Sequence, residues 1–222
     1  MANTYYLKFT LLSDATFGRG DGVAGLVDVE VQHDEYGLPF LGGRALKGIL
    51  RDTCNDILHS LKLQGKDSSW YKSASNLFGN PGSNDSNPAL LHIGDAKLPE
   101  DLLRAVEIEV KRCKLIREQV LGSLTSIRHQ TAIDNSTGAP KKETLRSIRV
   151  ILRETPFESK LLFSKSPSDR DLALLAACIK AFRRAGTGRN RGKGEISAKL
   201  YDESDKNVTE SLFNRFQEEV LK

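Results

Sequence analysis

Apolar and polar residues alternate in two segments near the start of the chain, residues 5–12 and 26–32. Leu7, Phe9 and Leu11 share one face of the first segment, and Val27, Val29 and Val31 share one face of the second. Such alternation is typical of a strand with one buried face. We therefore predict two strands here, the second with Asp28, Glu30 and Gln32 pointing outward.

From residue 44 the apolar positions follow a helical period, which predicts an amphipathic helix at 44–61. Periodicity and capping signals place the later elements in the same way. They are a short helix ending at 77–80, a strand at 89–93, a helix from Pro99 through about 121, extended arms at 125–134 and 146–155, a strand at 157–163, a helix at 169–184 beginning at Ser168, a strand at 195–200 and a helix at 208–221.

Strands that alternate polar with apolar residues suit a mostly antiparallel sheet covered by helices on one face. We therefore expect an α+β fold of the ferredoxin-like type. The alternative is a parallel, doubly wound sheet, but its inner strands would be continuously apolar, and these are not.

The composition is that of a soluble globular protein, with 39% apolar and 28% charged residues and no apolar run of membrane-spanning length. Three cysteines, Cys54, Cys113 and Cys178, stand far apart at apolar positions of helix-like segments. This spacing disfavours a disulfide framework or a zinc site and predicts buried, reduced thiols. With no signal peptide pattern at the N-terminus, we expect a cytoplasmic protein with no membrane partner.

The net charge is only +4, but its distribution is uneven. Residues 111–153 contain ten Lys or Arg against three acidic residues. Charge of one sign concentrated in one region favours a surface that faces a polyanion. The alternative is a basic face that only contacts solvent.

The densest combination of glycine and positive charge is G-T-G-R-N-R-G-K-G at 186–194. It is not a Walker A loop, since Thr187 stands at the first glycine position and Gly194 where Ser or Thr is needed. It is not a dinucleotide fingerprint either, because it follows a helix and precedes a strand. A purely structural turn would need one or two glycines rather than four. We interpret the loop as a binding site for a single-stranded RNA backbone, with amides and cations facing phosphates.

A second anion site is indicated at Gly42-Gly43, just before the helix at 44–61. Glycines there leave the first helical amides open, where the helix dipole favours a phosphate. Arg44 and Lys47 add positive charge on the same turn.

Taken together, these segments resemble the RAMP superfamily of CRISPR-associated proteins, specifically the repeated backbone subunit of type III RNA-guided effector complexes. The residues that carry the resemblance are G-L-V-D at 25–28, G-L-P at 37–39, G-G-R-A-L-K-G-I-L-R at 42–51, L-F-G-N at 77–80, I-D at 133–134 and the loop at 186–194. The resemblance implies a single domain over 1–222, a crevice for guide RNA, and a thumb hairpin at 123–148 that interrupts the guide–target duplex. It also implies head-to-tail copies, other type III subunits and a target single-stranded RNA as partners.

By position in the family motif, Arg44, Lys47 and Arg51 would hold guide phosphates, and Ile127 and Ile133 would be the thumb wedge. The full set of predicted RNA-binding residues is Arg19, Gly43, Arg44, Lys47, Arg51, Arg128, Arg146, Gly186, Gly188, Arg189, Arg191 and Lys193.

In the family, a loop aspartate directs metal-dependent cleavage of the target RNA, and Asp28 occupies its place. The residues that follow, Val29-Glu30, differ from the small residue and proline found in many relatives. Asp28 would hold a divalent metal ion, most naturally magnesium, while the target 2′-OH attacks the adjacent phosphate.

Two other functions stay open. A metal-independent guide-processing nuclease would need a histidine as general acid or base, with His33 and His129 as candidates. A guide-binding scaffold without cleavage would keep the phosphate contacts while Asp28 had no catalytic role.

Overall fold

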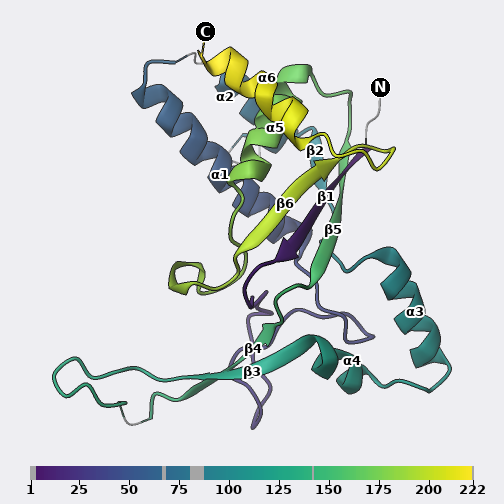
Figure 1. Ribbon diagram of the computed structural model, residues 1–222, viewed down its shortest axis with the longest axis vertical. Coiled ribbons are helices and arrows are strands. Elements are labelled where there is room, and N and C mark those ends of the chain that lie inside the picture. Colours follow the sequence, from purple (N-terminus) through teal and green to yellow (C-terminus); the bar gives the residue numbers. More distant parts are fainter. Residues whose placement is uncertain (1–3, 67–68, 81–87, 142, 222) are drawn as a thin grey trace.

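The computed structural model describes residues 4–66, 69–80, 88–141 and 143–221 (Figure 1). Its elements are β1 (Thr4–Leu11), α1 (Gly43–Leu63), α2 (Trp70–Phe78), β2 (Leu91–Ile93), α3 (Glu100–Lys111), α4 (Arg117–Leu124), β3 (Thr125–Gln130), β4 (Arg146–Ile151), β5 (Pro156–Phe163), α5 (Asp169–Ala181), a 3-10 turn (Arg189–Arg191), β6 (Ile196–Tyr201) and α6 (Thr209–Leu221).

The main sheet has four strands in the order β2-β5-β1-β6, and every neighbouring pair is antiparallel. Strands β3 and β4 form a separate antiparallel pair. The α+β class with antiparallel sheets is thus confirmed, and the parallel alternative is wrong. Along the chain the main sheet and its helices follow the order β-α-β-β-α-β, which suits the ferredoxin-like prediction.

Helices α1, α2, α5 and α6 lie together on one side of the sheet (Figure 1). The alternation predicted for β1 is confirmed, since Leu7, Phe9 and Leu11 are buried beneath these helices. Phe9 stacks on Phe157 of β5 with ring centroids 5.3 Å apart. Helix α5 begins with the capping box predicted at Ser168 and is buried over most of its length.

The segment 26–32 is not a regular strand of either sheet. It makes isolated bridges instead, including a parallel one from Val29 to Ile148 of β4. Val27 and Val31 are buried as the alternation requires, but Glu30 is buried too, at 1% exposure. The prediction that Glu30 points outward is wrong because this carboxylate pairs with a buried arginine of β4.

The single helix predicted from Pro99 to about 121 is two helices, α3 and α4. Between them Cys113 takes a left-handed backbone conformation, with φ 56°, which ends α3. Cys113 is therefore exposed, contrary to prediction, whereas Cys54 and Cys178 are buried as expected.

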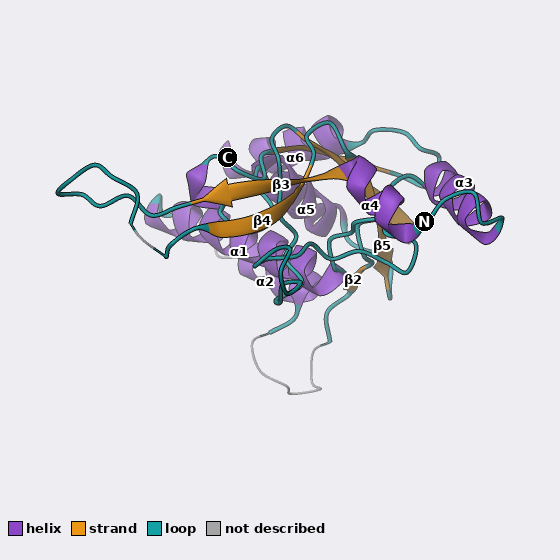
Figure 2. Ribbon diagram, turned by 90° about the horizontal axis from the view of Figure 1, so that it is seen from below, coloured by secondary structure: helices purple, strands orange, loops and turns teal. Residues whose placement is uncertain are grey.

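The two arms predicted at 125–134 and 146–155 do pair, as β3 and β4, from Thr125 opposite Ile151 to Gln130 opposite Arg146. From here on, the name thumb hairpin means this pair with its connection, residues 125–151, which overlaps the predicted range 123–148. Figure 2 shows its tip projecting from the body, on the opposite side from α3.

Candidate nucleic-acid interface

The loop at 186–194, hereafter the glycine loop, joins α5 to β6. All four of its glycines have positive φ, between 69° and 89°. A side chain at Gly186 would also lie 2.6 Å from the carbonyl oxygen of Thr16. The turn itself therefore accounts for four glycines, and our inference that four exceed structural need is wrong. The case for a binding site rests on the loop's cations.

Those cations face the thumb hairpin across a cavity of about 990 Å³. Its charged lining comes from Arg189, Arg191 and Lys193 of the glycine loop and from Arg146 of β4. A second cavity of about 870 Å³ shares Lys193 and the Gln130 end of β3 with the first. We call the two cavities together the thumb–loop groove.

The second cavity adds Arg128 and Arg153 to the groove. Arg128 donates to Asp14 at 2.9 Å, so its charge is compensated within the protein. The other groove cations differ from it, because no carboxylate of the described residues lies within ion-pair distance of them. These unpaired cations are Arg146, Arg153, Arg189, Arg191 and Lys193. The second cavity is also lined by the carboxylates of Asp14 and Glu154, so the groove has six cations against two acidic residues. This excess of positive charge attracts a polyanion.

Three of the predicted contacts at the start of α1 lie outside this groove, since neither cavity is lined by Arg44, Lys47 or Arg51. The helix start is also partly occupied by the protein itself. The amide of Gly43 donates to the Asp95 carboxylate at 2.8 Å, so the prediction that this amide is open to a phosphate is wrong.

Lys47 is engaged in the same way. Its ammonium donates to the carbonyl oxygen of Leu91 at 2.9 Å. Burial, with a smaller contribution from the charge of Arg51, lowers the pKa of Lys47 below 10.5. A half-buried lysine with a fixed backbone partner has less reach toward an RNA phosphate than the sequence suggested.

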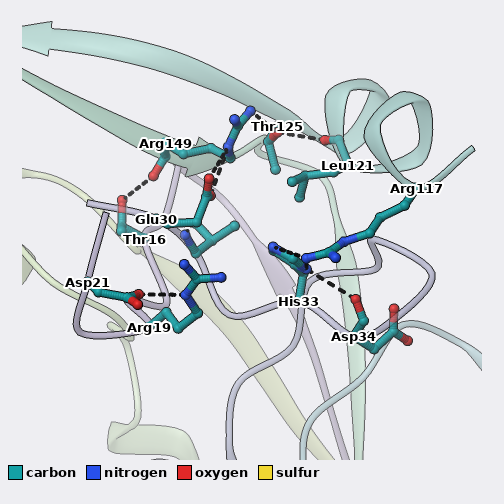
Figure 3. A network of polar contacts seen from close by, with 11 residues as sticks. Thr16, Arg19, Asp21, Glu30, His33, Asp34, Arg117, Leu121, Thr125 and Arg149 are labelled. Atoms are coloured by element: carbon teal, nitrogen blue, oxygen red, sulfur yellow. Dashed lines mark hydrogen bonds and ion pairs between the residues drawn. The ribbon is translucent and has the colours of Figure 1, made fainter. Parts of the chain in front are cut away.

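Asp28 is exposed at the base of the thumb hairpin. One carboxylate oxygen, Oδ2, accepts a hydrogen bond of 2.7 Å from the amide of Ser147. The loop 22–28 and Ser147 enclose a cavity of about 370 Å³ beside it. Arg19, another predicted contact, precedes this loop and is held in an ion pair with Asp21 (Figure 3).

Within the described residues, no three His, Cys, Asp or Glu side chains cluster closely enough to hold a metal ion. Asp28 thus offers one carboxylate alone. Mg²⁺ is commonly bound by one or two carboxylates together with substrate phosphates and water. A metal ion held at Asp28 would therefore need phosphate oxygens and water to complete its ligand set.

The two wedge candidates lie in different places. Ile133, near the tip of the hairpin, is 52% exposed. Ile127 is half-buried and pairs with Arg149 near the base of the hairpin. The histidine candidates are also separated, since His33 lies 3.4 Å from Arg117, whereas His129 contacts the Ser147 hydroxyl at 3.0 Å.

Two features of the site were not predicted from sequence. One is the buried ion pair between Glu30 and Arg149, and the other is the place of Arg153 in the groove. The sequence signal for the pair is an arginine within the apolar stretch 148–152, I-R-V-I-L.

The model of the RAMP superfamily matches residues 8–197 of the chain. The protein therefore belongs to the RAMP superfamily, as its motifs indicated. No curated protein matches the sequence.

Among solved structures, a chain of the Type III-B Cmr-beta complex bound to cognate target RNA is similar in fold. It superposes with a TM-score of 0.62 at 14% identity, covering 95% of this chain and 98% of that one. A chain of Type III-B Cmr-beta in the apo state gives a TM-score of 0.59 at 15% identity, covering 89% and 96%. The protein thus has the fold of chains in Type III-B complexes. In its described part, none of the helices has the length and apolar character needed to cross a membrane.

Proposed function

We propose that this protein binds guide RNA as a backbone subunit of a type III CRISPR effector complex. The observation that carries the proposal is the row of unpaired cations in the thumb–loop groove. Cations on a rigid groove contact the sugar–phosphate backbone without reading sequence, which suits a subunit that must accept any guide. Membership of the RAMP superfamily and similarity to Type III-B chains support the same function.

Other type III subunits and further copies of this chain, stacked head to tail, would be its protein partners. Guide RNA would lie along the groove, and the target single-stranded RNA would pair with it up to the thumb hairpin. The exposed Ile133 near the hairpin tip suits an apolar contact with a displaced base.

We further propose that the subunit cleaves the bound target RNA at the base of the thumb. In this reaction the 2′-oxygen of a target ribose bonds to the adjacent phosphorus and loses its proton to water. The bond from phosphorus to the 5′-oxygen breaks, and that oxygen takes up a proton. Holding these atoms in line supplies much of the rate.

Asp28 is the residue that we assign to the cleavage. It would contribute one carboxylate oxygen to a divalent metal ion, and the metal would supply stabilisation of charge on the phosphate oxygens. The Ser147 amide, which donates to Oδ2, orients that carboxylate. The second candidate function is an RNA-binding scaffold that lacks cleavage, which the departure of Val29-Glu30 from the small residue and proline of many relatives favours.

The test is Asp28→Ala in a complex assembled with guide RNA. Cleavage of complementary RNA should be lost while target binding persists. Glu35→Ala, which removes an exposed carboxylate seven residues later in the sequence, is the control and should cleave normally. Unchanged cleavage by Asp28→Ala would leave the scaffold as the function.

A further inference from the structure

The segment that carries Asp28 is bound edge-on to strand β4 of the thumb hairpin. The amide of Asp28 donates to the Ser147 carbonyl at 2.8 Å, and the Ser147 amide donates to the Asp28 carboxylate at 2.7 Å. One residue further along, the Arg149 amide donates to the Val29 carbonyl at 3.0 Å. Asp28 is therefore fixed to the hairpin by both its backbone and its side chain.

The same two segments are joined inside the protein by an ion pair. Both carboxylate oxygens of Glu30 accept from Nε of Arg149, at 2.8 and 3.1 Å. The side chains of Glu30 and Arg149 are only 2% and 11% exposed. Arg149 also donates to the Thr125 hydroxyl at 3.3 Å, as Figure 3 shows, which ties the pair to the start of β3.

A third segment joins this network from the opposite wall of the groove. The Thr16 hydroxyl donates to the Arg149 carbonyl at 3.0 Å (Figure 3). The carbonyl of Thr16 in turn accepts from the amide of Thr187, in the glycine loop, at 2.9 Å. A continuous chain of hydrogen bonds thus runs from Asp28 through β4 to the loop that bears the groove cations.

We propose that the Ser147 amide and the Glu30–Arg149 ion pair are positioning elements that hold Asp28 in register with RNA in the thumb–loop groove. This inference rests on the proposed function. It adds to the proposed function the contacts that hold the Asp28 carboxylate, which come from strand β4.

The physical reason lies in the isolation of Asp28. Among the described residues, the hydrogen bond from the Ser147 amide is the one polar contact that sets the direction of this carboxylate. A buried ion pair contributes little net stability but fixes one arrangement of the segments it joins, because any other leaves a charge unpaired. A misplacement of about 1 Å is enough to cost on the order of 100-fold in rate.

Ser147→Pro tests the amide directly, because it removes the N–H group that holds the carboxylate. The N–H and the C=O of Ser147 both point toward Asp28, so Ser147 makes no backbone hydrogen bond to His129, its partner on β3. Proline at this position therefore removes no hydrogen bond between β3 and β4. Ser147→Ala is the matched variant that keeps the amide. In the assembled complex we expect Ser147→Pro to cleave about 100-fold more slowly than Ser147→Ala under single-turnover conditions, with equal affinity for target RNA.

A merely structural role would instead change target affinity along with the rate. Equal cleavage rates for the two Ser147 variants would overturn the inference, provided that Asp28→Ala abolishes cleavage. If Asp28→Ala leaves cleavage intact, the proposed function fails instead. The two failures are thus distinguishable.

Hydrogen exchange in the purified full chain supplies a readout that needs neither RNA nor metal. Asp28→Ala removes the acceptor of the Ser147 amide, so exchange at that amide should accelerate by about tenfold or more. Glu35→Ala should leave it unchanged. Unaltered exchange in Asp28→Ala would overturn the inference, because the carboxylate would then not hold the amide, and this outcome can be measured even if Ser147→Pro does not fold.

Discussion

Replacement of both arginines of the glycine loop, Arg189→Ala with Arg191→Ala, should weaken RNA binding without unfolding the protein. Both side chains are exposed, line the thumb–loop groove and have no acidic partner among the described residues. Their loss therefore removes two charges from the groove and leaves the buried core unchanged.

The size of the effect follows from the charges in the groove. Its unpaired cations are Arg146, Arg153, Arg189, Arg191 and Lys193. If each neutralises one phosphate of a single strand, the logarithm of the binding constant should fall against the logarithm of salt concentration with a slope of about −3.5. The double variant should give a slope of about −2.1 and bind about 25-fold more weakly at about 0.1 M salt.

Fluorescence anisotropy with a labelled single-stranded RNA, titrated at several salt concentrations, measures both quantities. The control is Lys62→Ala with Lys72→Ala, which removes the same charge from exposed positions on α1 and α2, away from the groove. A slope that stays at the wild-type value in the Arg189 and Arg191 variant would refute the assignment of the groove. An equal loss in the control would show that only net charge matters.

Three further outcomes are expected. Gly194→Ala should lower the melting temperature far more than Gly192→Ala in thermal unfolding. Alanine in the left-handed conformation costs about 1–2 kcal/mol at both positions, because both have positive φ. Only at Gly194 would the new methyl group also overlap a backbone carbonyl oxygen. Arg149→Met should lower the free energy of unfolding, measured in urea titrations, by about 3–5 kcal/mol, because it leaves the Glu30 carboxylate buried and unpaired. A loss below about 1 kcal/mol would contradict the burial of this ion pair. Because the pKa of Lys47 is lowered in the folded protein, the unfolded chain binds more protons than the folded protein just below pH 10.5. The free energy of unfolding of the wild type should therefore rise relative to that of Lys47→Met as the pH approaches 10.5. A difference between the two free energies that does not change with pH would count against the burial of Lys47.

The hydrophobic pattern predicted the elements that form the main core. The strand at 5–12 and the helix at 44–61 were predicted correctly because each has a single buried face. The strand packs this face against the helices, and the helix packs it against the sheet. The break at Cys113 could not be foreseen, since the chain there has neither glycine nor proline. A left-handed cysteine depends on where α3 must end to let α4 lead into the thumb hairpin.

The segment 26–32 shows what alternation leaves undetermined. The pattern identified the buried valines, but it does not specify which segment will pair with them. The partner of Glu30 lies 119 residues later in the sequence, at Arg149. An ion pair at that separation exists only once the fold brings β4 to the loop, so the sequence predicted an outward carboxylate.

The candidate site was predicted in part for the same reason. The cations of the glycine loop and of β4 were singled out from local charge, and the fold brings them to one groove. The glycines at the start of α1 led to the prediction of a second phosphate site there. In the structure, however, the Gly43 amide is hydrogen-bonded to Asp95 and the Lys47 ammonium to the Leu91 carbonyl. Those contacts come from the first residue of β2 and from the turn after this strand, so they could not be predicted from the local sequence of α1.

Photo-crosslinking of the full chain to a single-stranded RNA containing 4-thiouridine, with the crosslinked peptides identified by mass spectrometry, tests the central claim most directly. The account predicts crosslinks within residues 128–131, 146–153 and 186–193, on both walls of the thumb–loop groove. Crosslinks confined to the helical layer of α1, α2, α5 and α6, with none in the groove, would contradict it.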